Sequence, residues 1–171
     1  CYINKTEEKE LSSWQRPIMI LREKNRLSNS VNNGIGTIGA MLPSMPFHYI
    51  LFHGIDTPVI VLTSGNISEE PIIADDNIAL EKLMPVAGAV LTYNREISNR
   101  ADDTVMRIVD NKISLLRRSK GFVPRPVDLT RNVDGILALG GELKNCFCLG
   151  KEEQAILSQH IGDLKNLTTY D

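Results

Sequence analysis

The chain has 171 residues, of which 42% are hydrophobic and 23% are charged, and its formal net charge is −2. This composition is typical of a globular protein with room for one domain and part of another. The near-neutral charge gives no global attraction to nucleic acid or to a membrane surface. No stretch approaches the roughly 18 apolar residues of a membrane span, and residues 1–10 lack the apolar core of a signal peptide.

The cysteine content indicates a reducing environment. The three cysteines are Cys1, Cys146 and Cys148, and an odd count with two so close together argues against a disulfide framework. We therefore expect a cytoplasmic protein. Cys146 and Cys148 lack a second cysteine pair, so we interpret them as core residues of a strand and expect no metal site. Because the first residue is Cys, we expect a fragment.

Short apolar runs predict strands along the whole chain. Four of them lie at residues 17–21, 37–42, 59–62 and 89–93. The run at 59–62 (VIVL) is continuous and β-branched, which predicts a central strand covered on both faces. Residues 104–109 and 113–117 predict a hairpin that turns at Asp110 and Asn111.

Helices and loops are predicted between these strands. Pro46 is well placed to begin a helix over residues 47–53, and residues 75–84 begin with acidic residues that favour a helix start. Residues 22–33 predict a polar loop. From residue 136 onward, three short apolar runs separated by charged turns predict a β-meander, which at roughly 40 residues is too small to bury a core alone.

The glycines of residues 34–39 fit the spacing G-x-G-x-x-G. A dinucleotide site of this type needs a strand before the glycines and a helix that begins at them. Here an Asn-rich loop precedes the glycines and two prolines follow closely. We therefore interpret them as loop glycines at the entry of a strand.

Polar residues directly follow the VIVL run, at Thr63, Ser64 and Asn66. Open α/β sheets bind ligands in loops at the carboxyl ends of their strands. Ser64 and Asn66 would point to one side of an extended segment, where a hydroxyl and an amide can hold a phosphate and a ribose or carbonyl oxygen. The local pattern alone favours a simple turn, since S-G-N is good turn chemistry.

Two charged stretches allow several interpretations. The paired carboxylates before Thr104 fit Mg²⁺ binding beside phosphates, and they equally fit the end of a hairpin strand. The cations after residue 116 fit a phosphate clamp, a solvated strand end or an RNA-binding surface. The residues concerned are Asp102, Asp103, Arg117, Arg118, Lys120 and Arg125.

The order of the motifs is more specific than any one of them. The chain carries, in this order, RPIMIL, GIGTIGAMLPSMPFHYILF, VIVLTSGNISEEPI, NRADDTVMR, LLRRSKGFVPRPVDL and GGELKNCFCLGKEEQAILSQHIGDL. Across residues 16–171 this series resembles the HypF family. The most specific part is the last block, which contains both GGELKN and SQHIGDL and follows RRSKGFVPRP after a short spacer. Stand-alone YrdC proteins resemble only the blocks before it.

The resemblance implies an α/β fold in two parts. Residues 1–128 would form a YrdC-like twisted mixed sheet with helices, lacking its N-terminal part. Residues 129–171 would form the first β-meander of an actin-like (ASKHA) α/β carbamoyltransferase domain. A K-x-R motif is expected before residue 1, the actin-like domain's metal-binding histidines beyond residue 171, and zinc only in parts of the full-length protein outside this chain.

The resemblance also implies an ATP-dependent carbamoyltransferase. HypF proteins use carbamoyl phosphate and ATP to form carbamoyl-adenylate with release of pyrophosphate. They pass the carbamoyl group to the C-terminal cysteine of a HypE-type protein during maturation of nickel–iron hydrogenases. We expect Mg²⁺ beside ATP, no contact with a membrane, and no activity from this chain by itself.

The site residues are implied position by position. Ser64 and Asn66 match the S-x-N motif of YrdC-like domains. Asp103 and Thr104 fall where related YrdC proteins have a Ser-Thr pair near the nucleotide. Thr104 matches this pair, whereas Asp103 departs from it. Binding of ATP and carbamoyl-adenylate is implied for Thr63, Ser64, Asn66, Thr104, Arg117 and Arg118. A nucleotide loop of the actin-like domain is implied for Glu142, Lys144 and Asn145. Catalytic residues are not identified, and the alternatives are threonylcarbamoyl-adenylate synthesis and a double-stranded RNA-binding module.

Overall fold

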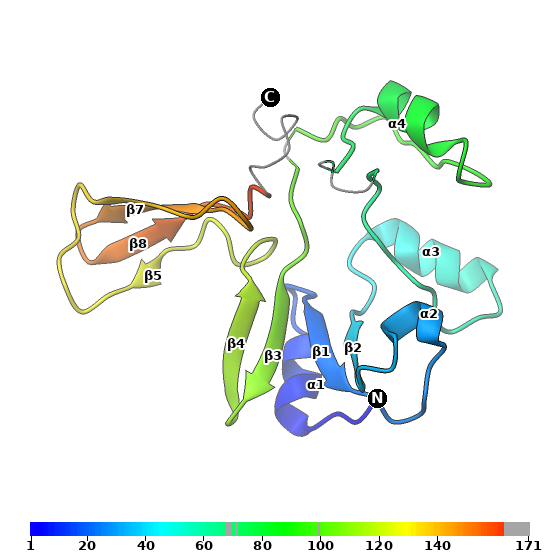
Figure 1. The fold of residues 1–171 in the computed structure, drawn as a ribbon, viewed down its shortest axis with the longest axis horizontal. Coiled ribbons are helices and arrows are strands. Elements are labelled where there is room, and N and C mark those ends of the chain that lie inside the picture. Colours follow the sequence, from blue (N-terminus) through cyan, green and yellow to red (C-terminus); the bar gives the residue numbers. More distant parts are fainter. Residues whose placement is uncertain (68–69, 71, 99, 163–171) are drawn as a thin grey trace. The chain divides into compact units, whose positions relative to one another are not determined.

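The structure is a computed structural model that describes residues 1–67, 70, 72–98 and 100–162. The chain divides into two compact units, each described by itself below. The first unit comprises Cys1–Leu62 and Asp103–Val123, and the second comprises Thr63–Asp102 and Pro124–Asp171. Figure 1 shows the elements of both units in chain order. No helix among the described residues is long and apolar enough to cross a membrane.

The first unit is built on a mixed four-stranded sheet with the strand order β2-β1-β3-β4. The central pair β1–β3 is parallel, while β1–β2 and β3–β4 are antiparallel. The mixed sheet and its helices confirm the predicted α/β class. The strands are β1 (Ile18–Arg22), β2 (Thr37–Ala40), β3 (Val105–Val109) and β4 (Lys112–Arg117).

The β3–β4 hairpin forms where the sequence predicts it. Asp110 and Asn111 take up φ values of 50° and 60°, the left-handed conformation that both central residues of a type I′ turn require. Asp and Asn tolerate this conformation better than most residues. The turn accounts for the register from Val109 opposite Lys112 to Met106 opposite Leu115, and the register shifts between Met106 and Val105.

The core of the first unit is small. Met19 and Leu21 on β1 alternate with partly exposed neighbours, and together with Met106 on β3 they are 0%, 2% and 0% exposed. Leu11 and Phe122 pack against this cluster. Leu11 ends helix α1 (Lys5–Leu11), whose N-terminus is fixed by a capping box between Asn4 and Glu7.

Two further helices belong to the first unit. Helix α3 (Pro46–Gly54) begins at the predicted proline, whose fixed φ suits the first helical turn. The short helix α2 (Asn29–Asn32) lies in a stretch for which we predicted only a loop. The glycines Gly34 and Gly36 have φ values of 72° and 74° in the loop before β2, which agrees with their interpretation as loop glycines.

The second unit contains helix α4 (Asp76–Leu83) and an antiparallel sheet with the order β5-β8-β7-β6. Asp75 caps the helix by accepting hydrogen bonds from the N–H groups of Asn77 and Ile78. Strands β6, β7 and β8 confirm the predicted meander, whereas β5 was not predicted. The strands are β5 (Val127–Asp128), β6 (Leu137–Leu139), β7 (Phe147–Lys151) and β8 (Gln154–Leu157). The boundary between residues 128 and 129 stays a prediction.

Two predicted strands are wrong. Residues 59–62 and 89–93 form no strand, and Val59, Val61 and Leu91 are 72%, 78% and 79% exposed. A β-branched run becomes a strand only where another strand offers its backbone and a second layer covers its side chains. Neither run finds such a partner in the described part of the chain.

Replacing Met106 by alanine is expected to lower the free energy of unfolding by about 2–5 kcal/mol, because the side chain is fully buried in a small core. Urea denaturation followed by circular dichroism measures this loss. The matched control is Met84→Ala, since Met84 is 46% exposed and its truncation leaves no cavity. Equal losses in the two variants would contradict the assignment of the core.

Candidate functional site

The loop that holds Ser64 and Asn66 is organised by its own side chains. The Ser64 hydroxyl donates to Asn66 Oδ1 at 2.6 Å, so the two side chains lie on the same side of the loop, as predicted. The Asn66 amide nitrogen donates to the carbonyl oxygens of Ile67 and Glu70, both at 3.0 Å. The Asn66 backbone N–H also donates to the Ser64 carbonyl at 3.2 Å. Asn66 therefore holds the loop closed.

The same loop is anchored to helix α4. The Glu70 carboxylate pairs with Lys82 Nζ of α4 at 2.8 Å, and the Gly65 carbonyl accepts a hydrogen bond from the Ile73 N–H at 3.0 Å. Ser64 is exposed and uses its hydroxyl hydrogen within the loop. A hydroxyl oxygen has two lone pairs, so Ser64 can still accept a hydrogen bond from a ligand.

The loop around Ser64 and Asn66 does not follow a strand, so the predicted position of this loop in the fold is wrong. We expected the loop at the carboxyl end of a buried strand, but residues 59–62 are not a strand and their side chains are largely exposed. The loop geometry comes instead from Asn66 and from the turn chemistry of S-G-N.

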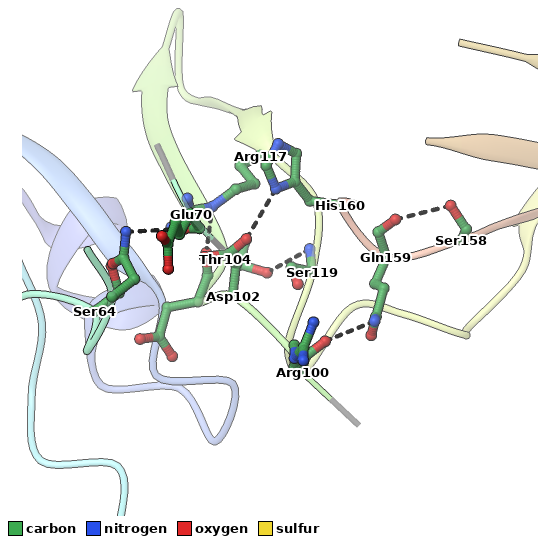
Figure 2. A network of polar contacts seen from close by, with 12 residues as sticks. Ser64, Glu70, Arg100, Asp102, Thr104, Arg117, Ser119, Ser158, Gln159 and His160 are labelled. Carbon is green, nitrogen blue, oxygen red and sulfur yellow. Dashed lines mark hydrogen bonds and ion pairs between the residues drawn. The ribbon is translucent and has the colours of Figure 1, made fainter. Parts of the chain in front are cut away.

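A second group of predicted residues surrounds the buried Thr104, which is 1% exposed. The Thr104 hydroxyl donates to the Lys120 carbonyl at 2.9 Å and accepts from the Ser119 N–H at 2.9 Å. The Thr104 carbonyl accepts from the Ile18 N–H of β1 at 2.8 Å. Figure 2 shows the contact with Ser119. Thr104 thus ties the turn after β4 to the starts of β1 and β3.

Cationic side chains gather at the same end of β4. Arg117 Nε donates to the Asp103 carbonyl at 2.9 Å, and Lys120 Nζ pairs with the Asp103 carboxylate at 3.4 Å. Arg118 is half-buried beside them. The Lys120 side chain is 43% exposed, and an ion pair of this kind contributes about 1 kcal/mol or less. Lys120 can therefore exchange Asp103 for a ligand phosphate at little cost.

The six predicted ligand-binding residues divide between the two units. Thr63, Ser64 and Asn66 belong to the second unit, whereas Thr104, Arg117 and Arg118 belong to the first. The structure brings Ser64 to Asn66, and Arg117 to the backbone that precedes Thr104. That both groups bind one nucleotide stays a prediction.

The predicted second nucleotide loop lies between β6 and β7. Glu142 and Lys144 are exposed, and Lys144 has a φ of 52°. Asn145 is half-buried, its N–H donates to the Gly162 carbonyl at 2.9 Å, and its own carbonyl accepts from the Ile161 N–H at 2.9 Å. The backbone of Asn145 is therefore fixed while its neighbours face solvent. The binding role of this loop stays a prediction.

The sequence analysis missed one pair of contacts. His160 Nδ1 lies 2.9 Å from Asp102 Oδ2, and Gln159 Nε2 donates to the Arg100 carbonyl at 2.6 Å (Figure 2). The sequence analysis assigned no role to His160, because its partner Asp102 is 58 residues away in the sequence. The only signal was the SQHIGDL block, whose residues 163–164 lie outside the described part of the chain.

The two carboxylates and the four cations of the charged stretches divide between the two units. Asp102 faces His160 while Asp103 faces Lys120. Among the residues that the structure describes, no three His, Cys, Asp or Glu side chains could hold a metal ion. Arg125 belongs to the second unit, whereas the other three cations of the RNA-binding alternative belong to the first.

Two family models match the chain. The model of the Sua5/YciO/YrdC family, described as "Telomere recombination", matches residues 1–119, and the model of the "HypF Kae1-like domain" matches residues 131–171. The chain therefore belongs to the Sua5/YciO/YrdC family.

Curated relatives carry the HypF name. "Carbamoyltransferase HypF" of Rhizobium leguminosarum bv. viciae is 38% identical over 170 residues, which cover 95% of this chain and 22% of the relative. "Probable carbamoyltransferase HypF" of Methanocaldococcus jannaschii is 36% identical over 170 residues, which cover 96% of this chain and 22% of the relative. The chain thus spans about a fifth of the length of these relatives.

Solved structures agree. "Crystal structure of T.kodakarensis HypF" matches with a TM-score of 0.90 and 44% identity over 99% of this chain and 22% of that one. "Crystal structure of full-length HypF in the phosphate- and nucleotide-bound form" matches with a TM-score of 0.90 and 41% identity over 99% of this chain and 27% of that one. The predicted resemblance to HypF carbamoyltransferases is confirmed.

Replacing Thr104 by valine is expected to cost about 1–3 kcal/mol of unfolding free energy, because the buried Ser119 N–H and Lys120 carbonyl lose their partner. Urea denaturation measures the change. Thr130→Val is the matched control, since Thr130 is exposed. A Thr104→Val variant as stable as the control would contradict the proposed role of this hydroxyl.

Proposed function

We propose that the whole protein to which this chain belongs is an ATP-dependent carbamoyltransferase of hydrogenase maturation. The observation that supports this proposal is the succession of a YrdC-type region and the start of a HypF Kae1-like region in one chain. Relatives named carbamoyltransferases share the sequence of both regions at 36–38% identity. A stand-alone threonylcarbamoyl-adenylate synthase would not need the second region.

The proposed reaction has three chemical steps. Water first cleaves carbamoyl phosphate to carbamate and phosphate. A carbamate oxygen then attacks the α-phosphorus of ATP, the bond to the bridging oxygen breaks, and pyrophosphate leaves with that electron pair. Finally, the cysteine thiolate of a HypE-type partner attacks the carbamoyl carbon, and AMP leaves. The second step is the one that residues of this chain would serve, through positioning and charge neutralisation.

The geometry supports distinct roles for the predicted residues. Ser64, exposed at the loop surface, would donate its hydroxyl hydrogen to a nucleotide phosphate in exchange for Asn66 Oδ1, with Thr63 beside it. Asn66 would hold that loop in shape. Arg117 and Arg118 would bind phosphate oxygens, because a guanidinium fork matches phosphate geometry. Thr104 is a positioning residue, since its hydroxyl is already engaged with the backbone of the phosphate-binding turn.

We propose Mg²⁺ as a companion of ATP. Magnesium is commonly held by one or two carboxylates together with substrate phosphates and water. The donor that fits in this chain is Asp103, whose weak pairing with Lys120 can be exchanged. Bound there, the ion would neutralise charge on the phosphates. Zinc and the final transfer site would belong to other parts of the full-length protein, which would act in the cytoplasm, and this chain alone would be inactive.

Replacing Ser64 by alanine in the full-length protein is expected to lower kcat/KM for ATP by about 10-fold or more, since a hydrogen bond to a charged ligand contributes roughly 1.5–3 kcal/mol. The bonds of Asn66 to Ile67 and Glu70 should survive. Carbamate-dependent ATP–pyrophosphate exchange is the assay. Ser30→Ala, at an exposed serine of α2, is the control. Unchanged exchange in Ser64→Ala would count against the site.

Asn66→Ala is expected to lower the same exchange by about 100-fold, because the loop loses its two backbone hydrogen bonds as well as the partner of Ser64. Circular dichroism and thermal melting should show a folded protein. Lys82→Ala, which breaks only the exposed ion pair with Glu70, is the control and should stay within about twofold of the unmutated protein. Similar activity in both variants would contradict the role of Asn66.

A further inference from the structure

Four residues of the second unit form a polar clasp between distant parts of the sequence. His160 Nδ1 lies 2.9 Å from the Asp102 carboxylate, and Gln159 Nε2 donates to the Arg100 carbonyl at 2.6 Å. The side chains of His160 and Asp102 are only 19% and 23% exposed. We call these four residues the 100–160 clasp; Figure 2 shows both contacts.

One end of the clasp is fixed to the antiparallel sheet. Ser158 directly precedes the clasp residues, its N–H donates to the Phe147 carbonyl at 2.8 Å, and its hydroxyl accepts from the Phe147 N–H at 3.0 Å. The Ser158 hydroxyl donates in turn to the Gln159 carbonyl at 2.8 Å. Gln159 and His160 are therefore presented by a segment that is bonded to β7.

The other end of the clasp leads into the predicted phosphate-binding group. Asp102 is followed in the chain by Asp103, whose carbonyl accepts from Arg117, and by Thr104, whose hydroxyl holds the Ser119–Lys120 turn. Arg100 and Asp102 lie within the residues matched by the YrdC-type model, whereas Gln159 and His160 lie within those matched by the HypF Kae1-like model. The clasp thus joins the two matched regions.

We propose that the 100–160 clasp is a positioning device that couples adenylate formation to carbamoyl transfer. It holds residues 100–102, the segment that enters the phosphate-binding group, to the first sheet of the region that follows. This inference rests on the proposed function and adds residues that act through others rather than on the substrate. His160 acts by its contact with Asp102, because a hydrogen-bonded Nδ1 fixes the orientation of the imidazole ring.

The positioning role predicts uncoupling rather than loss of the first step. In the full-length protein, His160→Ala should keep ATP–pyrophosphate exchange within about twofold, because the bonds of Thr104 to the Lys120 carbonyl and of Arg117 to the Asp103 carbonyl remain. The AMP released per carbamoyl group transferred should rise about fivefold or more, since small misplacements are costly in group transfer. The assay compares AMP production with labelled carbamoyl groups on the partner protein.

Further substitutions at the clasp residues distinguish a positioning role of His160 from a role in proton transfer. His160→Asn places an amide nitrogen where Nδ1 lies and should restore coupling close to that of the unmutated protein. Asp102→Ala also removes the contact with His160 and should uncouple the two steps at least as strongly as His160→Ala. The double variant should be no worse than Asp102→Ala, because both changes remove the same contact. Gln159→Ala should give a smaller change in the same direction, and it serves as the second variant should His160→Ala fail to fold.

The control is His53→Ala, since His53 is an exposed histidine of α3. Coupling in His160→Ala equal to that of the control would overturn the proposal. So would a His160→Asn variant as impaired as His160→Ala, because it would indicate that the imidazole itself transfers a proton. Absence of pyrophosphate exchange in the unmutated protein would overturn the proposed function, and the role of the clasp with it.

Discussion

The buried hydroxyl of Thr104 is the constraint on which the first unit depends. One side chain satisfies the Ser119 N–H and the Lys120 carbonyl, and the backbone of the same residue accepts from Ile18. A buried polar group without a hydrogen-bond partner costs about 1–3 kcal/mol, whereas the net stability of a whole domain is only about 5–15 kcal/mol. The turn next to the predicted phosphate-binding cations is consequently fixed by the same residue whose backbone bonds to the start of β1 and leads into β3.

The predicted ligand-binding residues do different kinds of work. The Asn66 amide hydrogen-bonds to the backbone of the loop that contains Ser64. The Thr104 hydroxyl hydrogen-bonds to the backbone of the turn that follows Arg117 and Arg118. Preorganisation of this kind lowers the cost of ordering a site when the ligand binds. On the proposed function, Asn66 would therefore be required even without touching the ligand. In our proposal, the 100–160 clasp positions a segment in the same way, but it does so between the two matched regions of the chain.

The sequence predicted the local features well and the distant ones poorly. The hairpin at Asp110 and Asn111, the proline-initiated α3 and the meander all follow from short-range turn and capping chemistry. The runs at 59–62 and 89–93 failed, because a strand needs a neighbour that composition cannot show. The contact of His160 with Asp102 was missed for the same reason, since it spans 58 residues. The family resemblance came from the order of motifs, while the internal bonds of Asn66 and Thr104 required the structure.

The most direct test of the central claim is hydrogen–deuterium exchange of the full-length protein with and without ATP. Two separate segments should become protected together at the same ATP concentration: the loop around Ser64 and Asn66, and the turn at residues 117–121. Their joint protection would show that one nucleotide engages both segments. Protection of only one segment, or of neither, would contradict the account.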